Sequence, residues 1–243
     1  MEKEKLQIVA FTDGACKGNP GPGGWGIVLL LTDGEVRELG GFDKHTTNNK
    51  MELTAVIQAL AKTEDQKEHL LILSDSKYVI DGLNNWLPKW QRNQWITSQG
   101  SPVANRDLWE ELSQLVNKRK LHGGGVSLKY VPAHSGIDGN ERADQIASGM
   151  GKGETLNFYI GRRDTYPHDL SIIEAVAAAA KNKNKPKVAL STHWYVSYVD
   201  DVFRIHTTWP DCEALVKSKA FAKYRKVETK EQEETLRRKW SSH

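Results

Sequence analysis

The chain has 243 residues, of which 38% are hydrophobic and 27% are charged, and its formal net charge is +3. This composition is typical of one large or two small globular domains, and no apolar run reaches the roughly 20 residues that span a bilayer. The N-terminus lacks the apolar core of a signal peptide and there are only two cysteines, so we expect a cytoplasmic protein, not associated with membranes, without a disulfide framework or a zinc site.

The first 150 residues predict a mixed α/β sheet with helices packed against it. Three β-prone runs joined by turns come first, and alternating helical and strand-like segments follow. The predicted strands are residues 6–12, 25–31, 35–42, 69–75 and 126–131. The predicted helices are residues 48–63, 76–87, 106–119 and 140–149, and Thr46 or Thr47 is placed to cap the first of them.

The pattern changes after Met150. Residues 151–191 have little periodicity and contain an Ala-rich run with a Lys/Asn tail, which predicts a linker with a short helix. Residues 192–243 predict a small module with the element order ββαβα. Residues 1–150 carry a formal charge of −2 and the remainder carries +5, so the basic character lies in the C-terminal part.

Four carboxylates fall at positions where the pattern predicts packing against the sheet. Asp13 continues the apolar face of the first strand, and Glu52 lies on the apolar side of the first helix. Asp75 ends the strand at residues 69–75, and Asp144 lies in the first turns of the last helix of this region. Asp75 taken alone is equally well explained as a cap of the helix that follows it.

A cluster of carboxylates without counter-charges resists ionisation, because the negative charges repel one another. A divalent cation removes that repulsion. Carboxylate and water oxygens suit Mg²⁺ or Mn²⁺, and two such ions can act on the attacking and leaving oxygens of a phosphodiester. The four acids, in a chain without a Cys/His ligand set, therefore predict metal-dependent phosphoryl chemistry.

Four segments in collinear order resemble type 1 ribonuclease H: FTDGACKGNPGPGGWG, TTNNKMELTAV, LSDSKYV and PAHSGIDGNERADQIA. The resemblance covers residues 6 to about 150. It implies a five-stranded mixed sheet flanked by helices. It also implies an endonuclease that hydrolyses the RNA strand of RNA·DNA hybrids and leaves 5′-phosphate and 3′-hydroxyl ends.

The resemblance assigns catalytic roles to five residues. It implies that Asp13, Glu52, Asp75 and Asp144 hold two Mg²⁺ ions, for which Mn²⁺ can substitute. It places the catalytic histidine of the family at His134, in a Gly- and Ser-bearing loop, where the imidazole can relay a proton or assist the release of product.

The resemblance also implies contacts with the hybrid. Small polar residues would read the 2′-hydroxyl groups across the minor groove, although a lysine stands at position 77 where many relatives carry glutamine. Thr47 and Asn105 would hold a phosphate of the DNA strand. Trp86 belongs to a protrusion at residues 84–106, in which we also expect tryptophan packing. Asparagines before a helix are capping residues in many proteins, which is the alternative for this group. The predicted substrate-binding residues are Cys16, Asn19, Thr47, Asn48, Asn49, Lys77, Trp86 and Asn105.

Residues 194–236 resemble the small hybrid-binding domain attached to many type 1 ribonucleases H, on the strength of the YV strand, the TTW motif and KYRKVET. The resemblance implies that Trp209, Tyr224, Arg225 and Lys226 contact a duplex, either an RNA·DNA hybrid or double-stranded RNA. Because the protrusion has few basic residues, we expect this module to raise substrate affinity. A dimerisation or structural module is the alternative.

Two other functional classes remain open at this point. Transposases and integrases share the fold and the acidic metal chemistry, although the collinear motifs argue against them. A nucleic-acid-binding protein with an inactive site is the second class, and the presence of all four acids argues against it. We expect a monomer.

Overall fold

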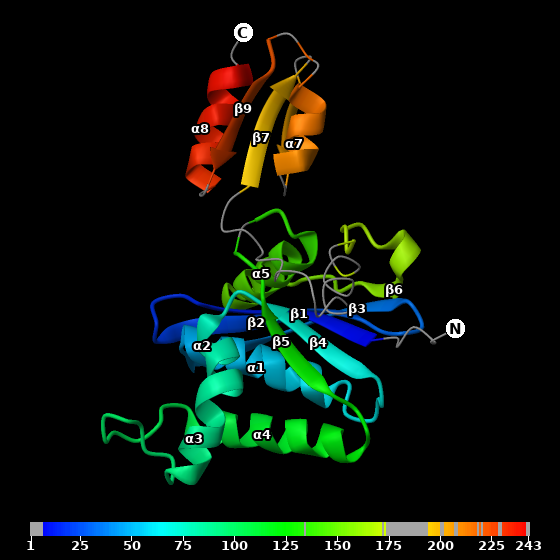
Figure 1. The fold of residues 1–243 in the computed structure, drawn as a ribbon. Helices are drawn as coiled ribbons and strands as arrows, with labels where there is room; N and C mark the ends of the chain where they lie inside the picture. Colours follow the sequence, from blue (N-terminus) through cyan, green and yellow to red (C-terminus); the bar gives the residue numbers. More distant parts are fainter. Residues whose placement is uncertain are drawn as a thin grey trace. The chain divides into compact units, whose positions relative to one another are not determined.

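The structure is a computed structural model, in which the chain forms two compact units (Figure 1). The first unit contains most of the chain up to Ala177, and the second unit begins at Ala178. Among the helices that the structure describes, none is long and apolar enough to cross a membrane. The described residues are 7–133, 135–171, 173, 194–199, 202–206, 209–217, 219, 221–227 and 230–241.

A mixed sheet with the strand order β5-β4-β1-β2-β3-β6 forms the centre of the first unit. The chain pairs β1 with β2 and β2 with β3 as an antiparallel meander, whereas β4 and β5 extend the sheet in parallel beside β1. The strands are β1 (Gln7–Cys16), β2 (Gly21–Leu30), β3 (Glu35–Thr46), β4 (His69–Ser74), β5 (Val126–Tyr130) and β6 (Ile160–Arg162). The first acid of the sequence pattern, Asp13, therefore lies on a central strand.

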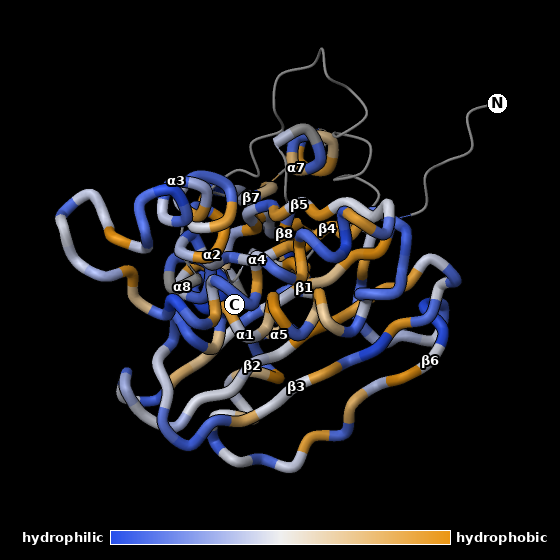
Figure 2. The backbone as a smooth tube through the Cα atoms, turned by 90° about the horizontal axis from the view of Figure 1, so that it is seen from below, coloured by the Kyte–Doolittle hydropathy of each residue, from blue (hydrophilic) through white to orange (hydrophobic). Residues whose placement is uncertain are grey.

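Helices cover both faces of this sheet (Figure 1). One face carries α1 (Asn48–Ala61), and α4 (Arg106–Leu121) packs against α1, so that α1 is buried on more than one side. The other face carries α5 (Asp138–Gly151). Apolar side chains of β1, β2, β4 and β5 pack with those of α1 and α4, and Figure 2 shows hydrophobic segments along β1 and β4.

The first half of the chain between β4 and α4 is helical. It begins with α2 (Lys77–Asp81), passes through a π-helical turn (Gly82–Trp86) and continues as α3 (Leu87–Arg92), and a non-helical segment then leads to α4. The sequence predicts one helix that stops at residue 87, but Pro88 stands in the first turn of α3, where a missing N–H costs no hydrogen bond.

The first unit extends beyond the boundary that the sequence predicts. The sequence predicts a linker over residues 151–191, whereas β6, a 3₁₀ turn (Arg163–Thr165) and the buried side chains of Leu170 and Ile173 belong to the first unit. The sheet therefore has six strands instead of the expected five. The Ala-rich part of the predicted linker lies outside the described residues.

A buried arginine ties two loops of the first unit together. Arg119 is 1% exposed, and its guanidinium donates hydrogen bonds to the carbonyl oxygens of Thr63, Glu68 and Gly125. Its burial lowers the pKa of the guanidinium below the ordinary arginine value. One side chain thus satisfies carbonyl groups from the loops that precede β4 and β5.

Replacing this arginine is expected to destabilise the protein. The change Arg119→Met keeps most of the aliphatic stem but removes three hydrogen bonds that a buried, charged group donates, so we expect the free energy of unfolding to fall by about 3 kcal/mol. Urea denaturation measures the change. The matched control is Lys118→Met, which breaks the exposed ion pair with Glu64 and should cost less than about 1 kcal/mol. Equal losses in the two variants would contradict a structural role for Arg119.

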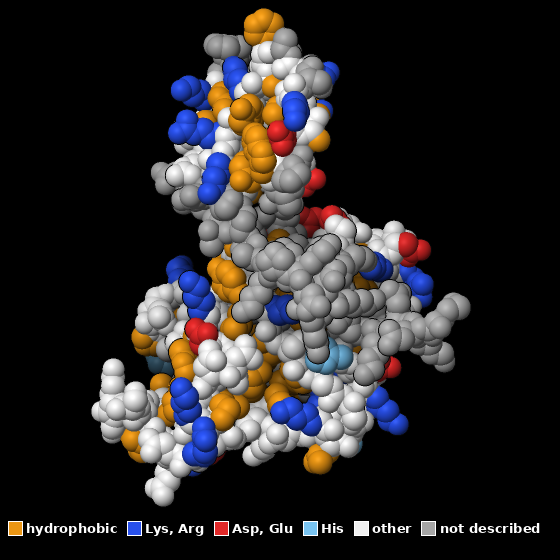
Figure 3. All heavy atoms as spheres, viewed as in Figure 1, with side chains coloured by type: hydrophobic (Ala, Val, Ile, Leu, Met, Phe, Trp, Pro, Cys, Tyr) orange, Lys and Arg blue, Asp and Glu red, His pale blue; other side chains and the backbone are white. Residues whose placement is uncertain are grey.

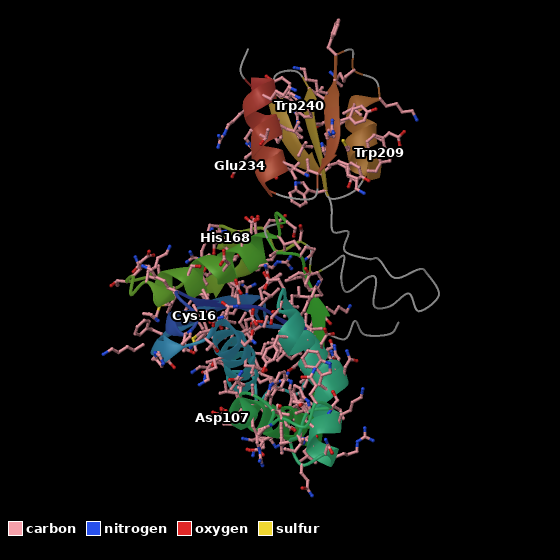
Figure 4. The ribbon with its side chains drawn as sticks, turned by 90° about the vertical axis from the view of Figure 1, so that its left-hand side faces the viewer. Cys16, Asp107, His168, Trp209, Glu234 and Trp240 are labelled. Carbon is pink, nitrogen blue, oxygen red and sulfur yellow. The ribbon has the colours of Figure 1, made fainter. Side chains whose placement is uncertain are left out.

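The second unit contains the predicted ββαβα order. Its antiparallel sheet has the strand order β8-β7-β9, and helices pack on both faces. Figure 4 shows Trp209 on one helix and Trp240 on the other, on the two sides of the sheet. The elements are β7 (Trp194–Val199), β8 (Val202–His206), α7 (Trp209–Val216), β9 (Lys223–Val227) and α8 (Lys230–Ser241).

Candidate active site

Two of the predicted acids meet across neighbouring parallel strands. The register pairs Phe11 of β1 with Leu73 of β4, so Asp13 and Asp75 each stand two residues beyond the same pair. Asp13 is 8% exposed, and its Oδ1 accepts a hydrogen bond of 2.7 Å from the backbone N–H of Gly14. The parallel arrangement therefore places two carboxylates at one level of the sheet.

A glycine brings the third acid to the same place. A Cβ added to Gly14 would lie 2.1 Å from the backbone nitrogen of Glu52, so the strand and α1 are in direct backbone contact there. The helix α1 begins at Asn48, because Thr47 before it acts as the N-cap and its hydroxyl accepts a hydrogen bond of 3.4 Å from the N–H of Lys50. The close approach of β1 and α1 places Glu52 beside Asp13.

The change Gly14→Ala is expected to move Glu52 away from the other acids. The added methyl group cannot fit without a shift of α1, so we expect kcat to fall by about 100-fold, because small displacements of reacting groups are costly. Steady-state kinetics measures this, with circular dichroism to establish folding. Gly100→Ala serves as the control: nothing lies within 4 Å of the added Cβ, and the strain of its positive φ (81°) is confined to the loop that contains residue 100. Equal kcat values would show that the contact at Gly14 does not position the site.

Two polar side chains orient the Glu52 carboxylate. Ser76 donates to Oε2 at 2.5 Å, and the Asn48 side-chain amide donates to Oε1 at 2.9 Å. The hydroxyl of Ser76 also accepts from the N–H of Val79 and caps α2. The cap of this helix is therefore Ser76, which leaves Asp75 without the capping role that the sequence allowed for it.

The fourth acid comes from the opposite face of the sheet. Asp144 lies on α5 and accepts a hydrogen bond of 3.2 Å from Ser148. Near the start of the same helix, Asn140 donates to Asp75 at 3.4 Å. The helix thus contacts the acid at the end of β4 and contributes an acid of its own.

The electrostatics show that the four acids form one group. Burial, together with the charges of Asp75, Asp144 and Glu52, raises the pKa of Asp13 to about 8, although the Gly14 N–H lowers it in part. Burial and the charge of Asp75 also raise the pKa of Glu52, against the hydrogen bonds from Ser76 and Asn48. Without a cation, the four acids together would hold a proton at neutral pH, on Asp13.

The donor set fits a hard divalent cation. Within the described residues, no three carboxylate, imidazole or thiolate side chains converge as a complete metal-binding group. Mg²⁺, however, commonly takes one or two protein carboxylates and completes its shell with waters and substrate phosphates. An oxygen-only cluster around Asp13, in which one carboxylate resists ionisation, has both the ligand type and the unbalanced charge that such an ion requires.

One predicted catalytic residue has no structural description. His134 lies outside the described residues, although α5 begins four residues later with Asp138. Its assignment therefore remains a prediction from the sequence.

Three of the predicted substrate-binding residues lie together beside this cluster. The Cys16 thiol lies 3.3 Å from the carbonyl oxygen of Thr46, and the side-chain oxygen of Asn19 accepts from the N–H of Asn48 at 3.0 Å. These contacts join the end of β1, the β1–β2 loop and the start of α1. Figure 4 shows Cys16 at the end of the strand. Asn48 also holds Glu52, so it connects this polar group to the acids.

The other polar candidates serve local structure as well. Asn49 is exposed at the start of α1, and Thr47 caps that helix. Asn105 has a left-handed backbone (φ 55°) and donates to the hydroxyl of Tyr78 at 3.2 Å. Lys77 is exposed, with its ammonium 5.8 Å from the centre of the Tyr130 ring. The capping interpretation thus holds for Thr47, whose hydroxyl caps α1 whatever else it binds.

Two tryptophans of the protrusion, Trp86 and Trp90, belong to one aromatic cluster. Trp86 is half-buried, and its ring lies 5.6 Å from that of Trp90 and 6.3 Å from that of Tyr78. Trp90 lies 5.3 Å from the fully buried Trp109, and Trp95 is 9% exposed. The expected packing of tryptophans is confirmed, and Trp86 keeps a solvent-accessible surface.

In the second unit, the structure brings together two of the four predicted duplex-binding residues and adds a third aromatic ring. The rings of Trp209 and Tyr224 are 5.3 Å apart, and Tyr195 lies 5.4 Å from Trp209. Tyr224 is 52% exposed. Figure 3 shows Lys and Arg side chains beside apolar side chains on the visible face of this unit.

The two basic candidates of β9 lie on opposite faces of the strand. Lys226 pairs with Tyr195, on the face of α7, whereas Arg225 pairs with Val196, on the face of α8. Side chains of successive strand residues alternate between faces. The strand therefore places Lys226, and not Arg225, on the side of the Trp209–Tyr224 pair.

Sequence reasoning missed three residues of these two sites. Gly14 lies within the recognised motif, but only the position of α1 shows that this residue must lack a side chain. Ser76 looks like an ordinary helix cap in the sequence. Its position directly after Asp75 was the only hint that it also contacts the acids. Tyr195 alternates with buried residues in β7, so its face could be assigned only once the register was known.

Comparisons with known proteins agree with this geometry. The family model described as RNase H matches residues 5–151. A protein named Ribonuclease H from Prochlorococcus marinus is 45% identical over 157 residues, which cover 64% of this chain and 94% of the relative. Ribonuclease HI of Pseudomonas putida is 49% identical over 141 residues, which cover 58% of this chain and 90% of the relative.

A solved structure shows the same similarity. The crystal structure of LC9-RNase H1, described as a type 1 RNase H with the type 2 active-site motif, has a TM-score of 0.57 and 25% sequence identity. The match covers 77% of this chain and 95% of that chain. Residues 178–243 lie beyond the residues that the family model matches.

Proposed function

The chain belongs to the ribonuclease H family, whose members are endoribonucleases of RNA·DNA hybrids, and we propose that it cleaves the RNA strand through a two-metal site built on Asp13, Glu52, Asp75 and Asp144. Enzymes of this family depend on divalent metal ions. We propose Mg²⁺ as the resident ion, with Mn²⁺ as a substitute. The observation that carries this proposal is the geometry that gathers the acids: the parallel register sets Asp13 and Asp75 at one level, and the backbone contact at Gly14 brings in Glu52. The raised pKa of Asp13, to which the charges of the other three acids contribute, supports it.

The residues of the chain have distinct tasks in this reaction. Bound divalent ions would supply Lewis acidity toward the scissile phosphate and its attacking water. Asp13 and Glu52 present their carboxylates from rigid elements, and Ser76 and Asn48 hold the orientation of Glu52. Cleavage at the 3′-oxygen side of the phosphate leaves 5′-phosphate and 3′-hydroxyl ends. We assign proton relay or assistance to product release to His134, on the sequence resemblance alone.

Recognition of the hybrid is proposed for the polar group beside the acids. Cys16, Asn19, Asn48 and Asn49 are small enough to let a minor groove approach, and the 2′-hydroxyl is the local mark of the RNA strand. Lys77 extends this group toward β5. We propose that Thr47 and Asn105 hold a phosphate of the DNA strand and that Trp86 packs against its sugar–phosphate backbone.

We propose that the second unit binds the duplex and raises its affinity for the enzyme. The contact of Trp209 with Tyr195 and Tyr224 supports an aromatic surface for a sugar–phosphate backbone, with Lys226 on the same face. Arg225 would reach the duplex from the other face of this edge strand. We propose a domain boundary after the first compact unit, near residue 177. We propose a cytoplasmic monomer.

The experiment is a cleavage assay with labelled duplexes. Full-length protein is incubated with an RNA·DNA hybrid, double-stranded RNA and double-stranded DNA, each in Mg²⁺, in Mn²⁺ and in chelator. We expect cleavage of the RNA strand of the hybrid alone, with 5′-phosphate ends and only in the presence of metal. Cleavage of double-stranded DNA would indicate a different polynucleotidyl transferase. Binding of the hybrid without cleavage would indicate a nucleic-acid-binding protein.

A further inference from the structure

A buried carboxylate outside the acidic cluster accepts four hydrogen bonds. Glu38 of β3 is 2% exposed. Arg142 donates to both of its oxygens, at 2.7 and 2.8 Å, Tyr166 donates to Oε1 at 2.8 Å, and the N–H of Tyr159 donates to Oε2 at 3.0 Å. Burial alone would raise the pKa of Glu38, but these donors outweigh burial and lower it. The carboxylate is thus fully engaged as an anion.

The four donors come from two separate parts of the chain. Arg142 belongs to α5, whereas Tyr159 and Tyr166 belong to residues 154–171, which we call the strap. The strap also pairs with β3 through β6, and the N–H of Glu38 donates to the carbonyl oxygen of Tyr159 at 2.8 Å. Glu38 is therefore the point at which β3, α5 and the strap are joined.

The strap touches α5 at its start and near its end. The N–H of Asp169 donates to Asp138, the first residue of α5, at 2.9 Å. Near the other end, a Cβ added to Gly149 would lie 3.1 Å from the Leu156 side chain. The strap thus follows the helix that carries Asp144.

The strands under α5 present glycines to the helix. A Cβ added to Gly26 would lie 2.2 Å from the carbonyl oxygen of Ala143, and one added to Gly24 would lie 2.5 Å from that of Ala147. At these positions the helix packs against strand backbone, and the strands supply no side chain that interlocks with those of the helix, so a lateral contact adds resistance to rotation of α5 about its axis. Successive helical residues are about 100° apart, so Arg142 and Asp144 are roughly 200° apart around the axis. A fixed Arg142 therefore fixes the direction of Asp144 on the other side.

We propose that Glu38, Arg142 and Tyr166 are positioning residues for the reaction: the strap, anchored at Glu38, sets the rotation of α5 and thereby the placement of the Asp144 carboxylate. These residues lie outside the proposed metal and substrate contacts. The inference rests on the proposed function. It adds that the catalytic unit requires the segment after residue 151, which lies beyond the match to the family model.

Three full-length variants test this inference. Tyr166→Phe removes one hydrogen bond, Arg142→Lys keeps the charge but loses the paired geometry, and Glu38→Gln removes the anion. Glu35→Gln is the matched control. It also replaces a glutamate of β3, but the ion pair that it breaks, with Arg37, is partly exposed. We measure kcat and KM on a labelled hybrid, and Mg²⁺ and Mn²⁺ affinity of the substrate-free protein by calorimetry, at a temperature where each variant is folded.

We expect kcat to fall by about tenfold in Tyr166→Phe and by more in the other two variants, because a small displacement of one metal-binding carboxylate is costly. KM should stay within about twofold, and metal affinity should fall in the same order as kcat. The control should match the wild type in each measurement. If Glu38→Gln does not fold, the other two variants decide.

Lower thermal stability with unchanged kcat and unchanged metal affinity would overturn the inference, because the strap would then serve stability alone. A rise in KM with kcat unchanged would also overturn it, since the strap would then act on substrate binding. Absence of metal-dependent hybrid cleavage by the wild type would instead contradict the proposed function. The two failures are thus distinguishable.

Discussion

Replacing Asp13 with asparagine is expected to abolish metal-dependent cleavage of an RNA·DNA hybrid and to stabilise the metal-free protein at neutral pH. The folded protein keeps a proton on Asp13 up to pH of about 8, because the pKa is raised to about 8, whereas the group has a pKa of 3.8 without the fold. Between these values the folded state binds more protons than the unfolded state. The stability of the metal-free wild type should therefore fall as pH rises from about 4 to about 8.

The variant Asp13→Asn cannot ionise at this position, so it should lose this part of the pH dependence. At pH 7 we expect it to exceed the metal-free wild type by at least about 1 kcal/mol in free energy of unfolding, since one pKa unit corresponds to about 1.4 kcal/mol. Urea denaturation in chelator at pH 5 and pH 8 measures the effect. A more stable but inactive variant would indicate that the acid is retained for function at a cost in stability.

A suitable control for this variant is Asp107→Asn, which changes an exposed acid in the first turn of α4. It should retain cleavage and the pH dependence of the wild type. Residual cleavage by Asp13→Asn would refute its place in the metal site. If Asp13→Asn shows the same difference in stability between pH 5 and pH 8 as the metal-free wild type, the electrostatic coupling of the four acids is refuted.

Removing the second unit is expected to raise KM for a long hybrid and to leave kcat nearly unchanged. A tethered second binding site can raise overall affinity by about 10²–10⁴-fold when both sites reach one duplex, so its loss should appear mainly in KM. The cut belongs near residue 177, because a cut at residue 150 would also remove β6 and the strap. Steady-state kinetics on hybrids of increasing length measures the effect.

Substitution within the full-length protein separates duplex binding from other roles of the second unit. The double change Trp209→Ala with Tyr224→Ala removes two of the three contacting rings and should reproduce most of the rise in KM. Phe221→Ala, which removes a ring that is 98% exposed and outside this group, is the control. An unchanged KM in both the truncated protein and the double variant would favour a structural or dimerisation module, which sedimentation would then reveal.

The sequence alone predicts the four acids as one group, and two of them break a local pattern. Asp13 interrupts a β-prone run, and Glu52 lies on the apolar side of a helix, so both predict a functional reason for burial. The strand-like run before Asp75 placed that acid at a sheet end. The parallel register then places Asp13 and Asp75 at one level, which no local pattern could establish.

The strap could not be predicted because its anchors are long-range and polar. Tyr166 and Glu38 are separated by 128 positions, and neither belongs to a periodic apolar pattern. The same limit applies to Gly14, whose need for a missing side chain depends on where α1 packs. Arg225 is a candidate through the resemblance of KYRKVET to the hybrid-binding domain, but the pairing of β9 with β7 decides which face it occupies.

The most direct test of the metal site is the number of protons that the protein releases when it binds a divalent ion. Calorimetric titration of the full-length protein with Mg²⁺ and with Mn²⁺ at pH 7, in two buffers of different ionisation enthalpy, gives this number. Because the pKa of Asp13 is raised to about 8, its carboxyl group is mostly protonated at pH 7, and binding at the four acids should release close to one proton per protein. Metal binding without proton release, or the same release from Asp13→Asn, would contradict a metal site centred on Asp13.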